Sequence, residues 1–124
     1  MPVVKSEHAV AHNLNDTRFD SYVAPSRGST ELCAWRVELP PGTAGLPHTV
    51  SREEVLLILS GAVRVHLDDA EVGASVGDVV HVPAGAAFAV DNPSAVPATA
   101  WVCTTVGLEA VLADGTRLRP PWTV

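Results

Sequence analysis

A histidine and a glutamate, His48 and Glu54, stand six residues apart in the segment that runs from Gly42 to Gly61. This segment ends in the apolar run Val-Leu-Leu-Ile-Leu, which is typical of a β-strand. Side chains alternate between the two faces of a strand, so positions 48, 50 and 54 share a face if the strand is regular. An imidazole and a carboxylate that point together into an interior can form a metal site or an acid–base pair.

The two cysteines offer little further chemistry. Cys33 and Cys103 are too few for a zinc knuckle and have no CxxC spacing. Each stands in an apolar run, where a cysteine behaves as a small hydrophobic residue. We expect both to be free thiols.

Composition limits the class of protein. The chain has 124 residues, of which 47% are hydrophobic and 18% charged, so we expect one globular domain over residues 1–124. No apolar run approaches the ~20 residues of a membrane span, and the first residues lack the apolar core of a signal peptide, so we expect a cytoplasmic protein without membrane contact. The net charge is −6 and the eight basic residues are scattered, which argues against nucleic acid. The alanine- and valine-rich composition, with a single lysine, favours a GC-rich bacterial genome.

Short apolar runs separated by turn residues dominate the chain and predict an all-β protein. The run Leu32–Leu39 alternates with Cys33, Trp35, Val37 and Leu39 on one face. Residues 55–59 are apolar at every position, so we expect that strand to be buried on both sides. Residues 1–20 form a polar arm, for which we expect a short strand near Val3-Val4 and histidines at the surface, namely His8 and His12. Eight or more short strands favour a sandwich or barrel.

Two motifs carry a resemblance to the cupin family of small jelly-roll barrels. The first family motif is a glycine, five residues, His-x-His, three or four residues, a glutamate, six residues and a glycine. Gly42, His48, Glu54 and Gly61 match it, while Val50 stands at the second histidine. The second motif is a glycine, five residues, Pro-x-Gly, two residues, a histidine, three residues and an asparagine. It is matched by Gly77, Pro83, Gly85 and Asn92, with Phe88 at the histidine.

The resemblance implies a double-stranded β-helix, or jelly-roll barrel, with its motif core at residues 42–92. Cupins with the full motif hold iron, manganese, nickel, zinc or copper through three histidines and the glutamate. With Val50 and Phe88 in two of these positions, the site is degenerate, and His48 and Glu54 would hold such a metal weakly or not at all. A third ligand could come from Cys33 or Cys103. The strand parity of His66 and His81 turns both away from the interior, and Glu53 has the solvent-facing parity.

Two functions remain open. The first is an enzyme acting on a small, largely apolar molecule, with His48 as acid or base and Glu54 orienting it, in an isomerisation, cyclisation, dehydration or lactone opening, or in oxygenase chemistry if a metal is held. The second is a binding or sensory protein without catalysis or metal. A purely structural hydrogen-bonded pair of His48 and Glu54, packed under Trp35, is the third interpretation. The expected pocket residues are Trp35, Val50, Leu56, Ile58, Phe88 and Trp101.

The resemblance also implies a homodimer, because cupins often pair through sheet faces or exchange an N-terminal strand, and an apolar sheet needs covering. Trp122 follows Pro120-Pro121, and we expect it to hold the C-terminus against the barrel. Arg36 and Arg64 have outward parity and are expected in solvent.

Overall fold

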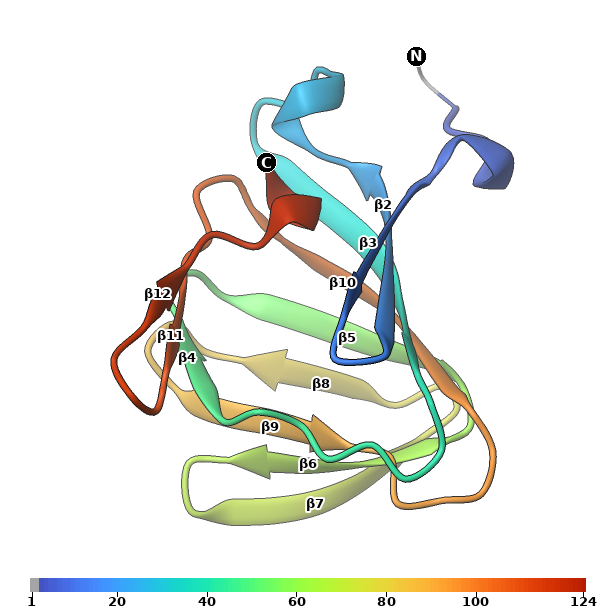
Figure 1. Ribbon diagram of the computed structural model, residues 1–124, viewed down its shortest axis with the longest axis vertical. Helices are drawn as coiled ribbons and strands as arrows, with labels where there is room; N and C mark the ends of the chain where they lie inside the picture. The colour runs from blue at the N-terminus through green and yellow to red at the C-terminus, as the bar shows by residue number, and fades with distance from the viewer. Residues whose placement is uncertain (1–2) are drawn as a thin grey trace.

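Two antiparallel six-stranded sheets pack face to face in the computed structural model, which describes residues 3–124 (Figure 1). The first sheet has the strand order β1-β2-β3-β10-β5-β8 and the second β12-β11-β4-β9-β6-β7. The strands are β1 Val10–Leu14, β2 Thr17–Val23, β3 Leu32–Leu39, β4 His48–Val50, β5 Glu54–Ser60, β6 Ala62–Leu67, β7 Ala70–Ser75, β8 Val79–Val82, β9 Ala87–Asp91, β10 Ala98–Thr105, β11 Ala110–Leu112 and β12 Arg117–Leu118. The expected all-β jelly roll is confirmed.

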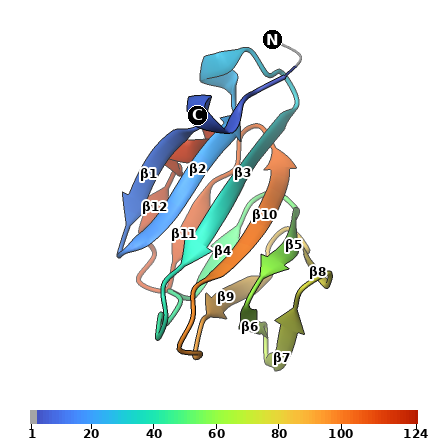
Figure 2. The ribbon, with the colours of Figure 1, turned by 90° about the vertical axis from the view of Figure 1, so that its right-hand side faces the viewer.

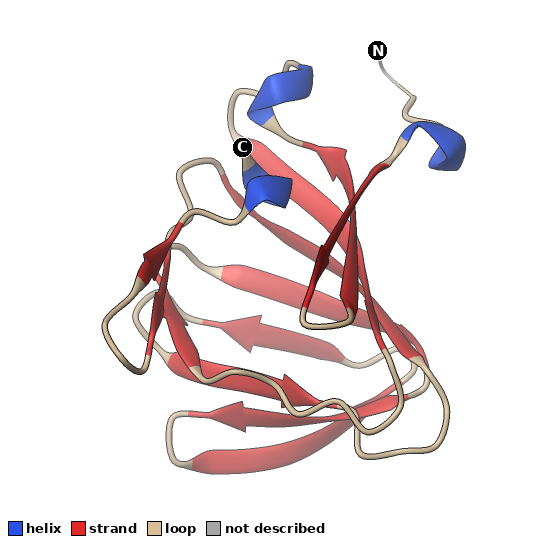
Figure 3. Ribbon diagram, viewed as in Figure 1, coloured by secondary structure: helices blue, strands red, loops and turns tan. Residues whose placement is uncertain are grey.

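Helix is confined to three short 3-10 turns within residues 3–124: η1 Ser6–His8, η2 Pro25–Arg27 and η3 Pro121–Thr123 (Figure 3). None of them has the length to cross a bilayer. The turn η3 packs against β1, β2 and β3 at the end of the molecule opposite the β6–β7 hairpin (Figures 1 and 2). The C-terminal tail therefore closes one end of the space between the sheets.

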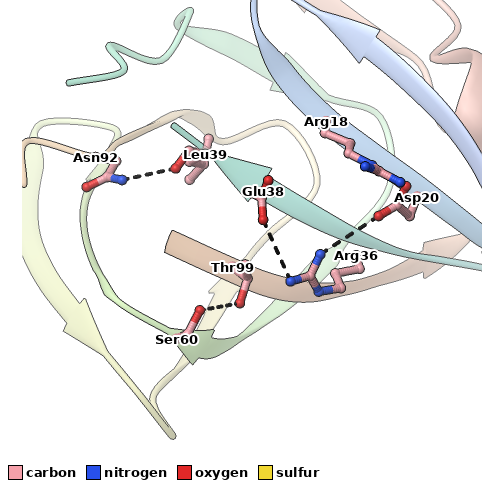
Figure 4. Close-up of polar contacts among 8 residues, drawn as sticks. All are labelled: Arg18, Asp20, Arg36, Glu38, Leu39, Ser60, Asn92 and Thr99. Carbon is pink, nitrogen blue, oxygen red and sulfur yellow. Dashed lines mark hydrogen bonds and ion pairs between the residues drawn. The ribbon is translucent and has the colours of Figure 1, made fainter. Parts of the chain in front are cut away.

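The alternation expected for β3 is confirmed. Its inward residues, Cys33, Trp35, Val37 and Leu39, are 0–8% exposed and belong to the core. On the opposite face, Arg36 lies 3.8 Å from Asp20 and 3.9 Å from Glu38, so a row of ion pairs covers the outside of β2 and β3 (Figure 4). Surface pairs of this kind stabilise a fold by less than about 1 kcal/mol each, so the core side of β3 determines its position.

Asn92 has a structural role that explains its motif position. Its side chain is fully buried, and its Nδ2 donates to the carbonyl oxygens of Leu39 at 3.0 Å and Val96 at 2.8 Å (Figure 4). Its Oδ1 accepts hydrogen bonds from Ser94. A buried amide with its polar atoms satisfied fixes the turn after β9 against the end of β3.

The N-terminal arm differs from the expectation. Residues 3–5 form no strand, and the chain instead builds the β1–β2 hairpin, whose two-residue turn is Asn15-Asp16 with positive φ at both positions. Positive φ at both central residues is the type I′ geometry, which asparagine and aspartate tolerate. The polar composition of this segment concealed a hairpin that forms the edge of the first sheet.

The expectation that residues 55–59 are buried on both faces is wrong for the single chain. Leu56 and Ile58 face the core at 6% and 2% exposure, whereas Val55, Leu57 and Leu59 are 38–43% exposed. The outward face of β5 is thus apolar and open.

The close approach of the backbone at Gly61 predicts a loss of stability when a side chain is added there. Gly61 has φ +73°, and an added Cβ would lie 2.7 Å from the carbonyl oxygen of Pro97. Gly77 has φ +90° but open space around it, so Gly77→Ala reports the backbone strain alone. We expect Gly77→Ala to lower the free energy of unfolding by about 1–2 kcal/mol and Gly61→Ala by about 3 kcal/mol or more, measured by urea denaturation. Equal losses in the two variants would contradict the close approach of Pro97.

Candidate functional site

A cavity of about 460 Å³ lies between the two sheets and is lined mainly by apolar side chains. Among the residues that line it are Trp35, Val50, Leu56, Ile58 and Phe88, all expected in a pocket from the sequence. A volume of this size is typical of sites for small organic ligands. The only titratable side chains among its described lining residues are Glu54 and His48.

Glu54 reaches the cavity because of its place in β5. It is the first residue of that strand and has the same parity as Leu56 and Ile58, which are core residues. Its backbone neighbours are Val82 of β8 and Thr104 of β10, so strands cover it on both sides. The side chain is only 5% exposed, and burial alone shifts the pKa of its carboxyl group, with no contribution from a hydrogen bond or a charged partner in residues 3–124.

The apolar surroundings change the acidity of this carboxyl group. Burial disfavours the charged form and raises the pKa of Glu54 from 4.5 to about 7. No positive side chain among the described lining residues opposes that effect. Glu54 therefore exchanges a proton near neutral pH, which is the condition for general acid–base catalysis.

His48 stands on the opposite wall, in the second sheet. It pairs with Phe88 of β9 and Leu112 of β11, and its ring lies 4.5 Å from the Phe88 ring. Its Nδ1 donates to the carbonyl oxygen of Leu46 at 2.8 Å. In the neutral ring this hydrogen bond places the proton on Nδ1 and leaves Nε2 as an acceptor.

The expected pairing of His48 with Glu54 is wrong in its geometry. No hydrogen bond joins the two side chains in the part of the chain that the structure describes, and Leu46, not Glu54, orients the imidazole. The reason is that β4 and β5 belong to different sheets, so the two residues face each other across the cavity instead of lying side by side on one strand. They are two separate groups that share one space.

A second network holds the loop before β4. The Oδ1 of Asp91 accepts a hydrogen bond from the backbone N–H of Gly45 at 2.7 Å, and its Oδ2 lies 2.7 Å from Nε2 of His66. The same contacts lower the pKa of Asp91, against the opposing effect of its partial burial. Gly45 packs so closely on the backbone of Val90 that a side chain would not fit there. The loop that carries the Leu46 carbonyl is therefore fixed to β9.

The donor set does not fit a metal ion of the cupin kind. No cluster of three or more His, Cys, Asp or Glu side chains with metal-binding geometry occurs in residues 3–124. Val50 and Phe88 line the cavity where the other two histidines would stand. Neither cysteine is among the described lining residues: Cys33 donates its thiol to the carbonyl of Thr123, and Cys103 is only partly buried. Two ligands are too few for a stable transition-metal site.

The aromatic residues divide between the cavity and the surface. Trp35 and Phe88 line the cavity, but Trp101 does not, which corrects the expectation that it forms a pocket wall. Trp101 has the outward parity of β10, and its ring lies 5.3 Å from that of Tyr22 in an edge-on arrangement. Residue 101 alternates with the core residue Val102, so the alternation along the strand already indicated that Trp101 faces outward.

Trp122 and Phe19 are two aromatic cavity residues that were not expected in the pocket from the sequence. Trp122 was expected to hold the C-terminus in place, and its ring stacks on Phe19 at 3.6 Å, but both rings also line the cavity. The backbone carbonyls of η3 accept hydrogen bonds from Ser21 and Cys33, which fix the tail. The tail and the unexpected β1–β2 hairpin together supply this wall, and only the three-dimensional arrangement reveals it.

The remaining polar candidates lie outside the cavity. His81 is exposed and bonded to Glu53, as their parity indicated. His66 is partly exposed on the outer face of β6, where Arg64 pairs with Glu71 at 3.0 Å. In the arm, His8 is exposed and His12 is half-buried, 6.4 Å from the Trp122 ring.

The pKa of Glu54 predicts how stability depends on pH. The native state binds the Glu54 proton more tightly than the unfolded chain does. The contribution of the protonated carboxyl group to the free energy of unfolding is therefore fully present below about pH 4.5 and is lost as the pH rises to about 7. The shift corresponds to about 3 kcal/mol. We expect Glu54→Gln to be more stable than the wild type by that amount at pH 8, with the advantage shrinking towards pH 4.5, in urea denaturation series.

Glu31→Gln is the matched control, because Glu31 is exposed and lies outside the cavity. Its difference from the wild type is expected to stay flat over the same pH range. A Glu54→Gln advantage that does not change with pH would show that the carboxyl group is not desolvated.

Comparison with known proteins identifies the family and the similar folds of this chain. The family model of the cupin domain matches residues 35–105. The polyketide cyclase RemF from Streptomyces resistomycificus superposes with a TM-score of 0.76 at 16% identity, over 85% of this chain and 79% of that chain. The protein TT1209 from Thermus thermophilus gives 0.69 at 25% identity, over 85% and 97%. A sugar phosphate isomerase from Silicibacter pomeroyi gives 0.67 at 21%, over 86% and 78%.

No curated protein matches the sequence. The matched family segment covers more than half of the chain and contains β5, β9, β10 and most of β3, which surround the cavity. The chain belongs to the cupin family.

Proposed function

We propose that this cupin binds a small, largely apolar molecule between its sheets and catalyses proton transfer on it. The observation that carries the proposal is Glu54, a carboxyl group that is 5% exposed, faces a cavity of about 460 Å³ and has no hydrogen-bond or charge partner within residues 3–124. An unpaired buried acid costs stability, and groups of this kind concentrate at functional sites.

The two titratable groups stand on opposite walls, which suits an acid and a base acting on one ligand. A ligand between the sheets would meet Glu54 from β5 on one side and His48 from β4 on the other. Glu54 in its protonated form donates a proton to a carbonyl oxygen of the ligand. Nε2 of His48 removes a proton from the neighbouring carbon.

The products of this step are an enol, a carboxylate and an imidazolium. The C–H bond breaks, its electron pair forms the C=C bond, and the carbonyl oxygen takes the proton of Glu54. Returning the proton to a different carbon completes an isomerisation, and attack of the enol on a second carbonyl completes a cyclisation. No step passes through a metal, because the donor set does not fit one. Polyketide cyclase and sugar phosphate isomerase are among the named activities of similar folds, and they support enzyme chemistry in general terms.

The alternative is a binding protein without catalysis. It is favoured by the scarcity of polar lining groups, since besides the two titratable residues only Asn15, Thr17, Thr43 and Thr99 line the cavity with polar side chains in the described part of the chain. Few groups are then available to stabilise charge that develops during a reaction.

Deuterium exchange separates the two functions. The protein is incubated in D₂O at neutral pD with α-tetralone, a rigid apolar ketone, and the loss of the proton signal next to the carbonyl is followed by NMR. We expect the wild type to exchange one of the two prochiral protons selectively, and Glu54→Gln and His48→Gln to lower the protein-dependent rate by ~10²-fold or more.

Glu53→Gln is the control, because Glu53 precedes Glu54 but is exposed. Its rate should equal that of the wild type. Binding of the ketone without accelerated exchange, or exchange that survives both site variants, would contradict catalysis and favour the binding protein.

We also propose that a second copy covers the outer face of β5 and β8. Val55, Leu57 and Leu59 are 38–43% exposed there, and Val79 is 62% exposed on the neighbouring strand. A largely aliphatic surface, bordered by the His81–Glu53 pair beside Val55, suits an isologous pairing, in which the same patch meets itself.

Light scattering over a micromolar concentration series tests the homodimer. We expect a dimer for the wild type and a monomer for Leu57→Glu, because a buried unpaired charge at the centre of the patch opposes association. Val72→Glu is the matched control, since Val72 is 58% exposed on β7 of the other sheet, and it should remain dimeric. A monomeric wild type, or a dimeric Leu57→Glu, would contradict this interface.

A further inference from the structure

The lack of arginine and lysine side chains in the described cavity lining restricts which ligands can bind there. None of the described lining residues is an arginine or a lysine. Two arginines of the neighbouring strands, Arg36 and Arg64, are engaged in ion pairs on the outer faces of the sheets. An anionic ligand would therefore lose its hydration with no arginine or lysine to pair with, a cost of several kcal/mol that only a protonated His48 could offset among the described lining residues. Ionised Glu54 would repel it further.

A cationic ligand gains little more. It could pair with ionised Glu54, but the other acceptors for its three donors are uncharged: Nε2 of His48 and the side chains of Asn15, Thr17, Thr43 and Thr99 in the described lining. Two charges would then be buried among apolar walls, where the loss of hydration often exceeds the attraction between them.

A neutral ligand with one acceptor oxygen matches the lining. Protonated Glu54 has one O–H donor without a partner in the described residues, so a single carbonyl or ether oxygen would satisfy it. The rest of the ligand would contact aliphatic side chains and the aromatic rings of Trp35, Phe88 and Trp122. Flat or fused-ring skeletons present the area that such rings cover best.

We propose that the cavity selects neutral, mostly apolar ligands whose one acceptor oxygen receives the O–H of Glu54, and that it rejects anions and ammonium ions of the same shape. This inference rests on the proposed function for the site itself, and it concerns binding alone. It separates this chain from cupins that act on phosphorylated or carboxylated substrates, because such substrates need a cation in the site.

Isothermal titration calorimetry at pH 6 with four probes of one skeleton tests this selectivity. The probes are α-tetralone, the corresponding amine, the corresponding carboxylate, and tetralin, which has no polar group. We expect α-tetralone to bind at least tenfold more tightly than the charged amine and carboxylate, and about tenfold more tightly than tetralin, the effect of one hydrogen bond. An amine or carboxylate that binds as tightly as the ketone, or a ketone without saturable binding, would overturn the proposal.

Glu54→Leu tests the role of the carboxyl group. Removing an unpaired buried acid should not impair folding, which a thermal melt verifies. In this variant the ketone should lose its advantage over tetralin while tetralin binding stays within about threefold, because only the hydrogen bond is removed. Glu31→Gln should keep the wild-type order. An unchanged ketone advantage in Glu54→Leu would overturn the assignment of Glu54 as the donor.

The outcomes remain distinct from those of the catalytic test. Charge-selective binding without deuterium exchange would leave this inference standing and contradict catalysis. Exchange that depends on Glu54 and His48, together with equal affinity for the three polar probes, would support catalysis and contradict the selection of neutral ligands.

Discussion

The alternation of side chains along β5 obliges Glu54 to face the space between the sheets, because Leu56 and Ile58 on the same face are core residues. A shift of one residue in the register of this strand would turn all three outward and bring Val55, Leu57 and Leu59 into the core in their place. The position of the acid is thus fixed by the same packing that holds the two sheets together. In the observed register, burying Leu56 and Ile58 also buries the carboxyl group of Glu54.

That constraint has an energetic cost which the rest of the structure offsets. Burial without a partner raises the pKa of Glu54 to about 7, which corresponds to about 3 kcal/mol when the group ionises. The surrounding core of both sheets, the buried Asn92 turn and the docked C-terminal tail supply the stability against which this cost is set. The second titratable group, His48, is held apart from the acid by the Leu46 carbonyl, in a loop that Asp91 fixes to β9. The two groups therefore keep separate roles around one cavity.

The sequence predicted the parts of this arrangement that depend on local spacing. Turn glycines, the alternation in β3 and the apolar replacements at Val50 and Phe88 are all visible in the chain, and they indicated the fold and the degenerate metal site. What could not be predicted depends on which sheet each strand joins. The separation of His48 from Glu54 follows from sheet topology, and the contribution of Trp122 follows from tail docking. The Asn15-Asp16 turn was a visible signal of a hairpin, but the polar composition of the arm obscured it. The outward parity of Trp101 was also visible, but the preference of tryptophan for protein cores obscured it.

Glu54 is a desolvated acid that changes its protonation state near neutral pH. The most direct measurement is a ¹³C NMR titration of the side-chain carboxyl carbons in glutamate-labelled protein, with Glu54→Gln used to assign the resonance. We expect a midpoint at about 7 for Glu54 in the free protein. A midpoint near the ordinary value of 4.5 would contradict it, because the carboxyl group would then be hydrated or paired and neither the proposed proton transfer nor the selection of neutral ligands would have a physical basis.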